Sequence, residues 1–361
     1  MVQVSVIIPA RDAAATLGAC LDALADQAVP GANAELIVVD DCSHDQTRTI
    51  AQRPNARVLH GAGRGPAVAR NLGARCAQGD ILVFLDADTV PRPGWLAELV
   101  TPFVDPQVVA VKGRYHTVQC GLVPRFAQLE FEDKYARLER ARRIDFVDTG
   151  TAAYRREAFL SSGGFDESFP AQSAEDVELA FRLSAAGARF VFNPRAGVCH
   201  RHAETLSAYL LKKMRYGFFR VAVYRRHPRK ALGDSYTPPV MAVQIGLVAC
   251  SWLFGVLLIA RPRSALRWAL AGVLGAFGMT TVALASRAAA DGFLLMLSVP
   301  LLVYARSAAQ GVGILIGLGR LVFERMVRQR QSPPASSSGQ DELPDEKPVM
   351  APSRTGVYAG V

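Results

Sequence analysis

Three long runs without charge near the C-terminus limit the possible folds of this chain more than any other feature. Residues 235–260 and 268–286 contain no charged side chain, and residues 292–319 contain only Arg306. Each run reaches the length that a helix needs to cross a bilayer. Buried helices of a soluble domain would show polar stripes, which these runs lack. We therefore predict a transmembrane region over residues 235–320. Its predicted segments are 237–260, 265–286 and 293–319.

The distribution of arginines leaves the topology of this region open. Three spans would place the C-terminus opposite the N-terminal domain, yet the arginines after the last run favour the cytosolic side. These are Arg320, Arg325, Arg328 and Arg330. The last run is interrupted by Pro300 and Arg306, so the alternative is a re-entrant hairpin, or an interfacial piece followed by a span. Arg306 is costly in lipid, and it either contacts an acceptor head group or snorkels to an interface.

A basic amphipathic segment directly precedes the first apolar run. Between Glu204 and Lys230 eight basic residues stand against one acid, and apolar residues recur there at helical spacing. They are Leu206, Leu210, Met214, Phe218 and Val221. This pattern predicts interface helices over residues 203–234 that bind membrane lipids of negative charge. The net charge of +9 is therefore explained without nucleic acid, which we do not expect as a partner.

Residues 1–202 alternate short apolar runs with helical patterns. Apolar strands are predicted at residues 4–8, 36–39, 57–59 and 81–85, with a helical pattern between each pair. Strict alternation of strand and helix indicates a mainly parallel sheet with right-handed crossovers. The fold class is therefore α/β, with a Rossmann-like domain over residues 1–202.

Polar residues follow three of these strands. Arg11 and Asp12 come after the first strand, Asp40 and Asp41 after the second, and Asp86-Ala87-Asp88 after the run that ends at Leu85. Ligands of such sheets bind beyond the carboxyl ends of the strands. Carboxylates suit hard divalent cations, which bind through one or two carboxylates and the phosphates of a substrate. The three groups therefore predict one binding site at one edge of the sheet.

Two further expectations concern the ends of the chain. Met1 leads directly into a strand without the features of a secretory signal, so we expect a cytosolic catalytic domain on an integral protein of the plasma (inner) membrane. Residues 331–361 are rich in Pro, Ser and Gly and predict a disordered tail.

Several motifs, taken in this order, resemble the inverting family-two nucleotide-sugar glycosyltransferases of the GT-A fold. The resemblance covers about residues 1–225. Its motifs are Val4-Ser5-Val6-Ile7-Ile8-Pro9-Ala10-Arg11-Asp12, Val38-Val39-Asp40-Asp41-Cys42-Ser43, Ala69-Arg70-Asn71-Leu72-Gly73, Phe84-Leu85-Asp86-Ala87-Asp88, Gly163-Gly164-Phe165-Asp166-Glu167 and Glu175-Asp176-Val177-Glu178-Leu179.

The resemblance implies a site for a nucleoside-diphosphate sugar. Pro9, Arg11 and Asp41 would border the base and ribose, with Arg70 near the nucleotide. Asp86 would contact the nucleotide side, and Asp88 would bind Mg or Mn. The cation would stabilise the charge that gathers on the diphosphate leaving group.

The same resemblance implies a general base and further ligands. Asp176 would take the proton of an acceptor hydroxyl in a single inverting displacement, with Glu175 beside it in the substrate site. Acids in a first helical turn also favour the helix dipole, so helix capping explains them equally well. His200 or His202 would reach the metal or diphosphate. We expect the two to lie on opposite faces of a strand, so that only one does so, and we choose His200.

Arg215 and Tyr216 occupy the place of Gln-x-x-Arg-Trp in processive members of the family. Arg215 would clamp the diphosphate and Tyr216 would stack on a sugar, but Lys212 stands where those enzymes have Gln. We therefore expect transfer to a lipid-linked, glycan or other membrane-proximal acceptor. The alternatives are a processive polysaccharide synthase and a non-catalytic nucleotide-sugar-binding scaffold.

Overall fold

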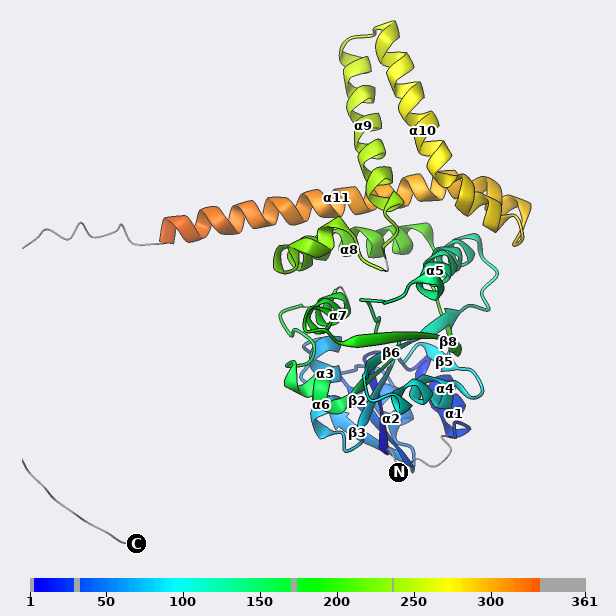
Figure 1. Ribbon diagram of the computed structural model, residues 1–361, viewed down its shortest axis with the longest axis vertical. Helices are drawn as coiled ribbons and strands as arrows, with labels where there is room; N and C mark the ends of the chain where they lie inside the picture. The colour runs from blue at the N-terminus through cyan, green and yellow to red at the C-terminus, as the bar shows by residue number, and fades with distance from the viewer. Residues whose placement is uncertain (1–2, 29–32, 170–173, 236, 332–361) are drawn as a thin grey trace, which may run out of the picture. The chain divides into compact units, whose positions relative to one another are not determined.

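The computed structural model describes residues 3–28, 33–169, 174–235 and 237–331, and its core is a mixed sheet of eight strands (Figure 1). The strand order is β3-β2-β1-β4-β7-β6-β8-β5. The strands are β1 Gln3–Ala10, β2 Asn33–Asp40, β3 Ala56–His60, β4 Ile81–Leu85, β5 Thr89–Pro91, β6 Val108–His116, β7 Thr151–Arg155 and β8 Arg189–His200. The predicted α/β domain with a mainly parallel sheet is confirmed, because only β5 and β7 run against the other strands.

Helices connect the strands and continue beyond the sheet. Those of the N-terminal part are α1 Leu17–Ala25, α2 Thr47–Ala51, α3 Pro66–Cys76, α4 Trp95–Val100, η1 Thr101–Val104, α5 Leu122–Arg140, α6 Arg156–Ser161 and α7 Glu175–Ala185. Those that follow are α8 Leu206–Arg226, η2 Pro228–Leu232, α9 Val240–Ala260, α10 Ser264–Ala288 and α11 Phe293–Gln331.

The register of the strands brings their carboxyl ends to one edge of the sheet. Ala10 pairs with Asp40, and β4 pairs with β1 in the same direction. All five residues of β4 are buried, as expected for a strand covered on both faces. The start of β7 reaches the same edge, because Leu85 pairs with Thr151 in an antiparallel ladder. This edge is called the carboxyl edge below.

Among the residues described after the sheet, three helices are long and apolar enough to cross a membrane. They are Val240–Ala260, Ser264–Ala288 and the part of α11 from Phe293 to Glu324. The first two form a hairpin of adjacent helices (Figure 1). The alternative of a re-entrant hairpin for the last run is not formed, because α11 is one helix that includes Pro300.

The chain divides into two units, residues 1–320 and 321–361. Within the first, β8 ends at His200 and α8 begins at Leu206, on either side of the predicted boundary at residue 202. Nearly all of the predicted disordered tail lies outside the described residues.

Candidate active site

Asp41 organises a glycine loop at the carboxyl edge. Its side chain is 3% exposed, and its two carboxylate oxygens accept hydrogen bonds from the backbone N–H groups of Gly63 (2.7 Å) and Gly65 (2.8 Å). Gly65 has φ 102°, a conformation that favours glycine. Arg11 donates to the carbonyl of Gly63 at 3.2 Å. Gly63 and Gly65 stand outside the motifs described above, and the structure places both against Asp41.

Arg70 links two acids that are far apart in the sequence. It lies on α3 and is 1% exposed. Its guanidinium donates to Asp86 at 2.7 Å and to Glu175 at 3.0 Å. The hydrogen bonds from a buried arginine to two carboxylates are charge-assisted, and they fix the position of all three groups. Pro9, near the end of β1, belongs to the same edge of the sheet.

Asp88 faces His200 without a hydrogen bond. The Asp88 carboxylate lies 4.0 Å from Nε2 of His200. Desolvation and the neighbouring Asp86 raise the pKa of Asp88 to about 6, because two adjacent carboxylates resist ionising together. Burial and the nearby Lys212 hold the pKa of His200 well below its ordinary value. A neutral imidazole beside a carboxylate has the chemistry of a cation ligand pair.

His202 does not point away from His200, so the expectation of opposite faces is wrong. The two Nδ1 atoms lie 3.3 Å apart, because residues two positions apart lie on the same side of an extended chain. Nε2 of His202 lies 3.0 Å from the side-chain oxygen of Gln128, and its ring stacks on Phe131. His200 is therefore the histidine that faces Asp88.

The donor set fits a cation that is shared with a substrate. Within the described residues, no group of three or more His, Cys, Asp and Glu side chains could hold a metal ion. The protein therefore forms no closed cage there, and Asp88 with His200 offers oxygen and nitrogen ligands on one side only. Mg and Mn bind in this way when phosphate oxygens complete the coordination.

Asp176 lies in the first turn of α7, near other acids. Burial raises its pKa to about 7, with further contributions from Glu175 and Asp148. Its Oδ1 accepts a hydrogen bond from the N–H of Val177 at 2.7 Å. A carboxyl with a pKa near neutrality can hold or release a proton at physiological pH, which is the property of a general base.

The buried pair of Lys112 and Asp148 was missed by sequence reasoning. Nζ of Lys112 lies 2.5 Å from the carboxylate of Asp148, and both side chains are buried. Asp148 stands three residues before β7, and Gly150 lies so close to Asp86 that an added Cβ would be 2.9 Å from its carboxylate. No sequence signal marked Lys112, which lies within a strand.

Helix α8 brings Tyr216 and Lys212 toward the acids, but not Arg215. Nζ of Lys212 lies 6.0 Å from the centre of the Tyr216 ring. Tyr216, Asp88 and Asp86 raise the pKa of Lys212 against partial desolvation, and its side chain, like that of Arg215, is exposed. Among the described residues, no contact joins Arg215 to the acidic groups. Lys212, which sequence reasoning treated as a departure from a motif, is therefore the cation of α8 that faces the site.

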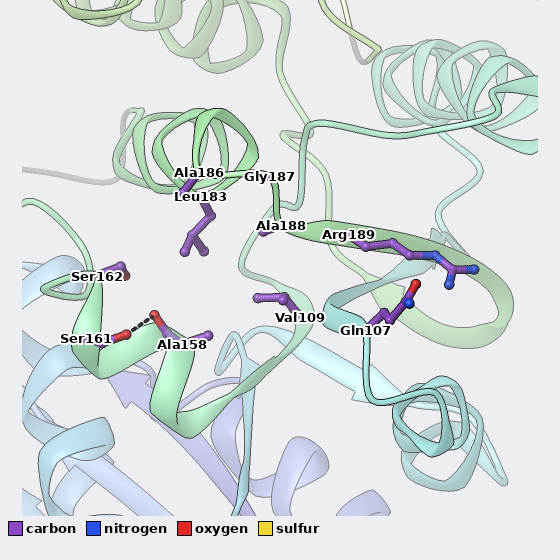
Figure 2. A pocket seen from close by; sticks show the side chains of 10 residues that line it. All are labelled: Gln107, Val109, Ala158, Ser161, Ser162, Leu183, Ala186, Gly187, Ala188 and Arg189. Carbon is purple, nitrogen blue, oxygen red and sulfur yellow. Dashed lines mark hydrogen bonds between the residues drawn. The ribbon is translucent and has the colours of Figure 1, made fainter.

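The pocket in Figure 2 belongs to a different part of the sheet. It has a volume of about 510 Å³ and is lined by residues from α6, the end of α7 and the starts of β6 and β8. Leu183, Ala158 and Val109 face the same space (Figure 2). Arg189, which lines the pocket, is the first residue of β8, whereas His200 is the last. The pocket is therefore separate from the carboxyl edge.

Comparisons with known proteins show similarity over the N-terminal part of the chain. Residues 5–162 match the model of Glycosyl transferase family 2. The Pre-mycofactocin glycosyltransferase of Mycobacterium tuberculosis (strain CDC 1551 / Oshkosh) is 33% identical over 241 residues, which cover 63% of this chain and 49% of the relative. The probable glycosyltransferase YdaM of Bacillus subtilis (strain 168) is 26% identical over 230 residues, covering 59% and 54%. The chain thus spans about half the length of these curated relatives.

A solved structure shares the fold. The mannosyltransferase PcManGT from Pyrobaculum calidifontis, in complex with GDP-Man and Mn²⁺, aligns with a TM-score of 0.55 and 23% sequence identity, over 87% of this chain and 86% of that one. At this level of identity the similarity concerns the arrangement of the elements alone.

Proposed function

We propose, from the match of residues 5–162 to Glycosyl transferase family 2, that the protein transfers a sugar from a nucleoside-diphosphate sugar to an acceptor at a membrane. The observation that supports this most strongly is the gathering of Asp41, Arg70, Asp86 and Asp88 at the carboxyl edge, beside His200. The named relatives are glycosyltransferases, in agreement with the proposal.

The donor site follows from the chemistry of these groups. The loop held by Asp41 would border the base and ribose, with Pro9 and Arg11 next to it. Arg70 fixes Asp86 on the nucleotide side. Asp88 and His200 would hold Mg or Mn, which supplies positive charge to the diphosphate. Lys212 adds a second positive charge from α8, and both oppose the charge that develops on the leaving group.

We assign Asp176 as the base that receives the acceptor's proton. The surrounding acids and burial disfavour its charged form, so it gains a proton more readily than an ordinary aspartate. Burial raises the pKa of Tyr216 and Lys212 lowers it, and Asp176 is near enough to add to the rise. An acceptor that packs on Tyr216 would therefore place its hydroxyl near Asp176, and the transfer would invert the anomeric centre.

The rate should depend on pH through Asp176. The base acts only when it is deprotonated, and its pKa is raised to about 7. We expect kcat/KM for a hydroxyl acceptor to be constant above this pH and to fall about tenfold per pH unit below it. A pH–rate profile of the purified protein measures this. A profile that stays flat down to about pH 5 would contradict Asp176 as base and favour an acceptor that ionises by itself, such as a phosphate.

Donor identity can be tested without knowledge of the acceptor. The purified full-length protein is heated with single nucleoside-diphosphate sugars, in the presence of Mn or Mg and again with a chelator. We expect one class of donor to raise the unfolding temperature and to require the cation. If no nucleotide sugar stabilises the protein under either condition, the proposed donor site is wrong.

The acceptor is expected at the membrane surface, because α8 connects the site to the apolar helices. α8 carries Lys212 and Tyr216 near the acids and continues to the candidate spans through η2. A lipid-linked or membrane-proximal acceptor fits a site that lies beside α8. A product that always carries one sugar per acceptor would distinguish single transfer from a polysaccharide synthase.

A further inference from the structure

The surroundings of Arg306 differ from those of a residue at the centre of a membrane span. It is the only charged residue of the run 292–319 and is 4% exposed. One guanidinium nitrogen lies 2.7 Å from the carboxylate of Glu130, which belongs to α5. The other donates to Gln244 near the start of α9. Arg306 is thus bound to the α/β part of the chain and does not face lipid.

The second half of α11 contacts α8 at the level of the backbone. A Cβ added to Gly313 would lie 2.0 Å from the carbonyl oxygen of Met214, and one added to Gly317 would lie 2.7 Å from that of Phe218. On the α8 side, a Cβ at Gly217 would lie 2.3 Å from the carbonyl oxygen of Gln310. Glycines on both helices therefore let α11 lie directly against the basic helix α8.

The first half of α11 packs against α5 and α8 through buried side chains. Leu295, Val299 and Leu302 pack in one cluster with Phe126 of α5 and Tyr209 of α8. From Leu295 to Gly317 a helix extends about 33 Å, which is close to the thickness of a bilayer core of about 30 Å. A helix that crossed this distance could not keep contacts with α5 and the basic helix α8 along its length.

The opposite side of α11 is apolar and exposed. Leu294 is 71%, Leu301 72% and Leu315 67% exposed, and apart from Arg306 no charge interrupts the run. A helix with one side on protein and a broad apolar side uncovered has the character of a helix that lies in a membrane interface. The α9–α10 hairpin packs against α11 through Val248 and Phe277, and its exposed residues are also apolar, among them Trp252 and Ile259.

Both ends of the α9–α10 hairpin are held on one side. At its end, Arg287 pairs with Asp133 of α5 at 2.8 Å, and Asp291 in the following turn pairs with Arg125 at 3.1 Å. At its start, Gln244 binds Arg306. Each helix of the hairpin is long enough to cross a bilayer once, so the chain leaves and returns on the side of the α/β domain.

We propose that α11 up to Arg320 lies in the membrane surface on the catalytic side, with its exposed apolar face in lipid, so that the chain crosses the bilayer only twice, through α9 and α10. The segment after Arg320 then stays on the catalytic side. The arginines that follow in the sequence agree with this, and they outnumber Arg261 and Arg263 in the turn of the hairpin.

Tags on the full-length protein test the number of crossings. One tag is placed at the N-terminus, one at Pro262 in the turn of the hairpin and one at the C-terminus. Their accessibility to antibody is measured in sealed vesicles of both orientations. We expect the two terminal tags to be accessible in the same vesicles and the Pro262 tag in the opposite ones. A C-terminal tag that appears together with the Pro262 tag would overturn the proposal.

A depth measurement tests the position of α11 itself. In a protein whose six cysteines are replaced by alanine, a fluorescent label is attached to Leu301→Cys or, as control, to Leu253→Cys within α9. We expect the Leu301 label to be quenched more by lipids brominated near the head group, and the Leu253 label by lipids brominated near the chain end. Equal deep quenching of both labels would contradict an interfacial helix. The absence of quenching at Leu301 by either lipid would show that protein covers this face, and it would also overturn the proposal.

Discussion

Asp176→Asn is expected to lower kcat for transfer to a hydroxyl acceptor by about 10²- to 10⁴-fold while leaving donor affinity nearly unchanged. The amide has almost the shape of the carboxylate but cannot accept the acceptor's proton. Donor binding depends on other residues, namely the loop at Asp41 and the pair of Arg70 and Asp86. The two quantities are measured as initial rates at saturating donor and as donor-induced thermal stabilisation of the same preparation.

A matched exchange of carboxylate for amide controls for effects on folding. Asp22 lies on the surface with 68% of its side chain exposed and pairs with Arg53, so Asp22→Asn should retain normal activity. The acid limb of the pH–rate profile should also disappear in Asp176→Asn. If Asp176→Asn keeps full activity, or if its loss is matched by an equal loss of donor binding, the role as base is wrong.

Glu130→Ala is expected to lower the free energy of unfolding by about 3–5 kcal/mol, the usual cost of breaking a buried ion pair by removing one partner. Glu130 receives hydrogen bonds from Tyr209 (2.6 Å), Lys213 (2.7 Å) and Arg306 (2.7 Å). Burial alone would raise the pKa of Glu130, but Lys213 and Arg306 hold it below its ordinary value. Without the carboxylate, two cations would remain buried and uncompensated.

Denaturation of the purified protein in detergent measures this loss. Glu139→Ala is the control, because Glu139 lies on the same helix but is 46% exposed. Arg306→Ala combined with Glu130→Ala should cost less than the sum of the two single changes, since the pair is lost only once. Additive losses would show that Glu130 and Arg306 do not interact as the structure indicates.

The parallel part of the fold was predictable because its signals are local. The run Ile81–Leu85 is apolar throughout, and the structure forms β4 over the same residues. Such a run indicates a strand covered on both faces, and the polar residues after it then fall at the carboxyl edge. The apolar runs after residue 235 were equally clear, and the structure forms helices α9, α10 and α11 there.

The contacts that hold the site together were not predictable in this way. Arg70 and Glu175 are 105 residues apart in the sequence, and Glu130 and Arg306 are 176 apart. No periodicity connects such pairs, because their proximity results from packing of the whole chain. Arg306 is the clearest example. Its sequence context suggested lipid or an acceptor head group, whereas the structure gives it a carboxylate on α5.

Packing between distant parts of the chain also explains why the expected residue of α8, Arg215, does not face the acids. The sequence motif pointed to Arg215, yet the rotation of the helix decides which residues face the acids. Close contact through Gly217 with α11 fixes that rotation, and it turns Lys212 and Tyr216 toward the site. The motif identifies the helix that approaches the site. It does not identify which side chain of that helix faces the acids, because this depends on the helix that packs against it.

The central claim is that the acids at the carboxyl edge bind a nucleotide together with a divalent cation. The most direct measurement is the binding of a nucleoside diphosphate to the full-length protein by calorimetry, with and without Mn, in the native sequence and in Asp88→Ala. We expect binding that requires Mn in the native protein and is lost in Asp88→Ala, while Asp22→Asn binds normally. Binding of equal strength without the cation, or in Asp88→Ala, would contradict it.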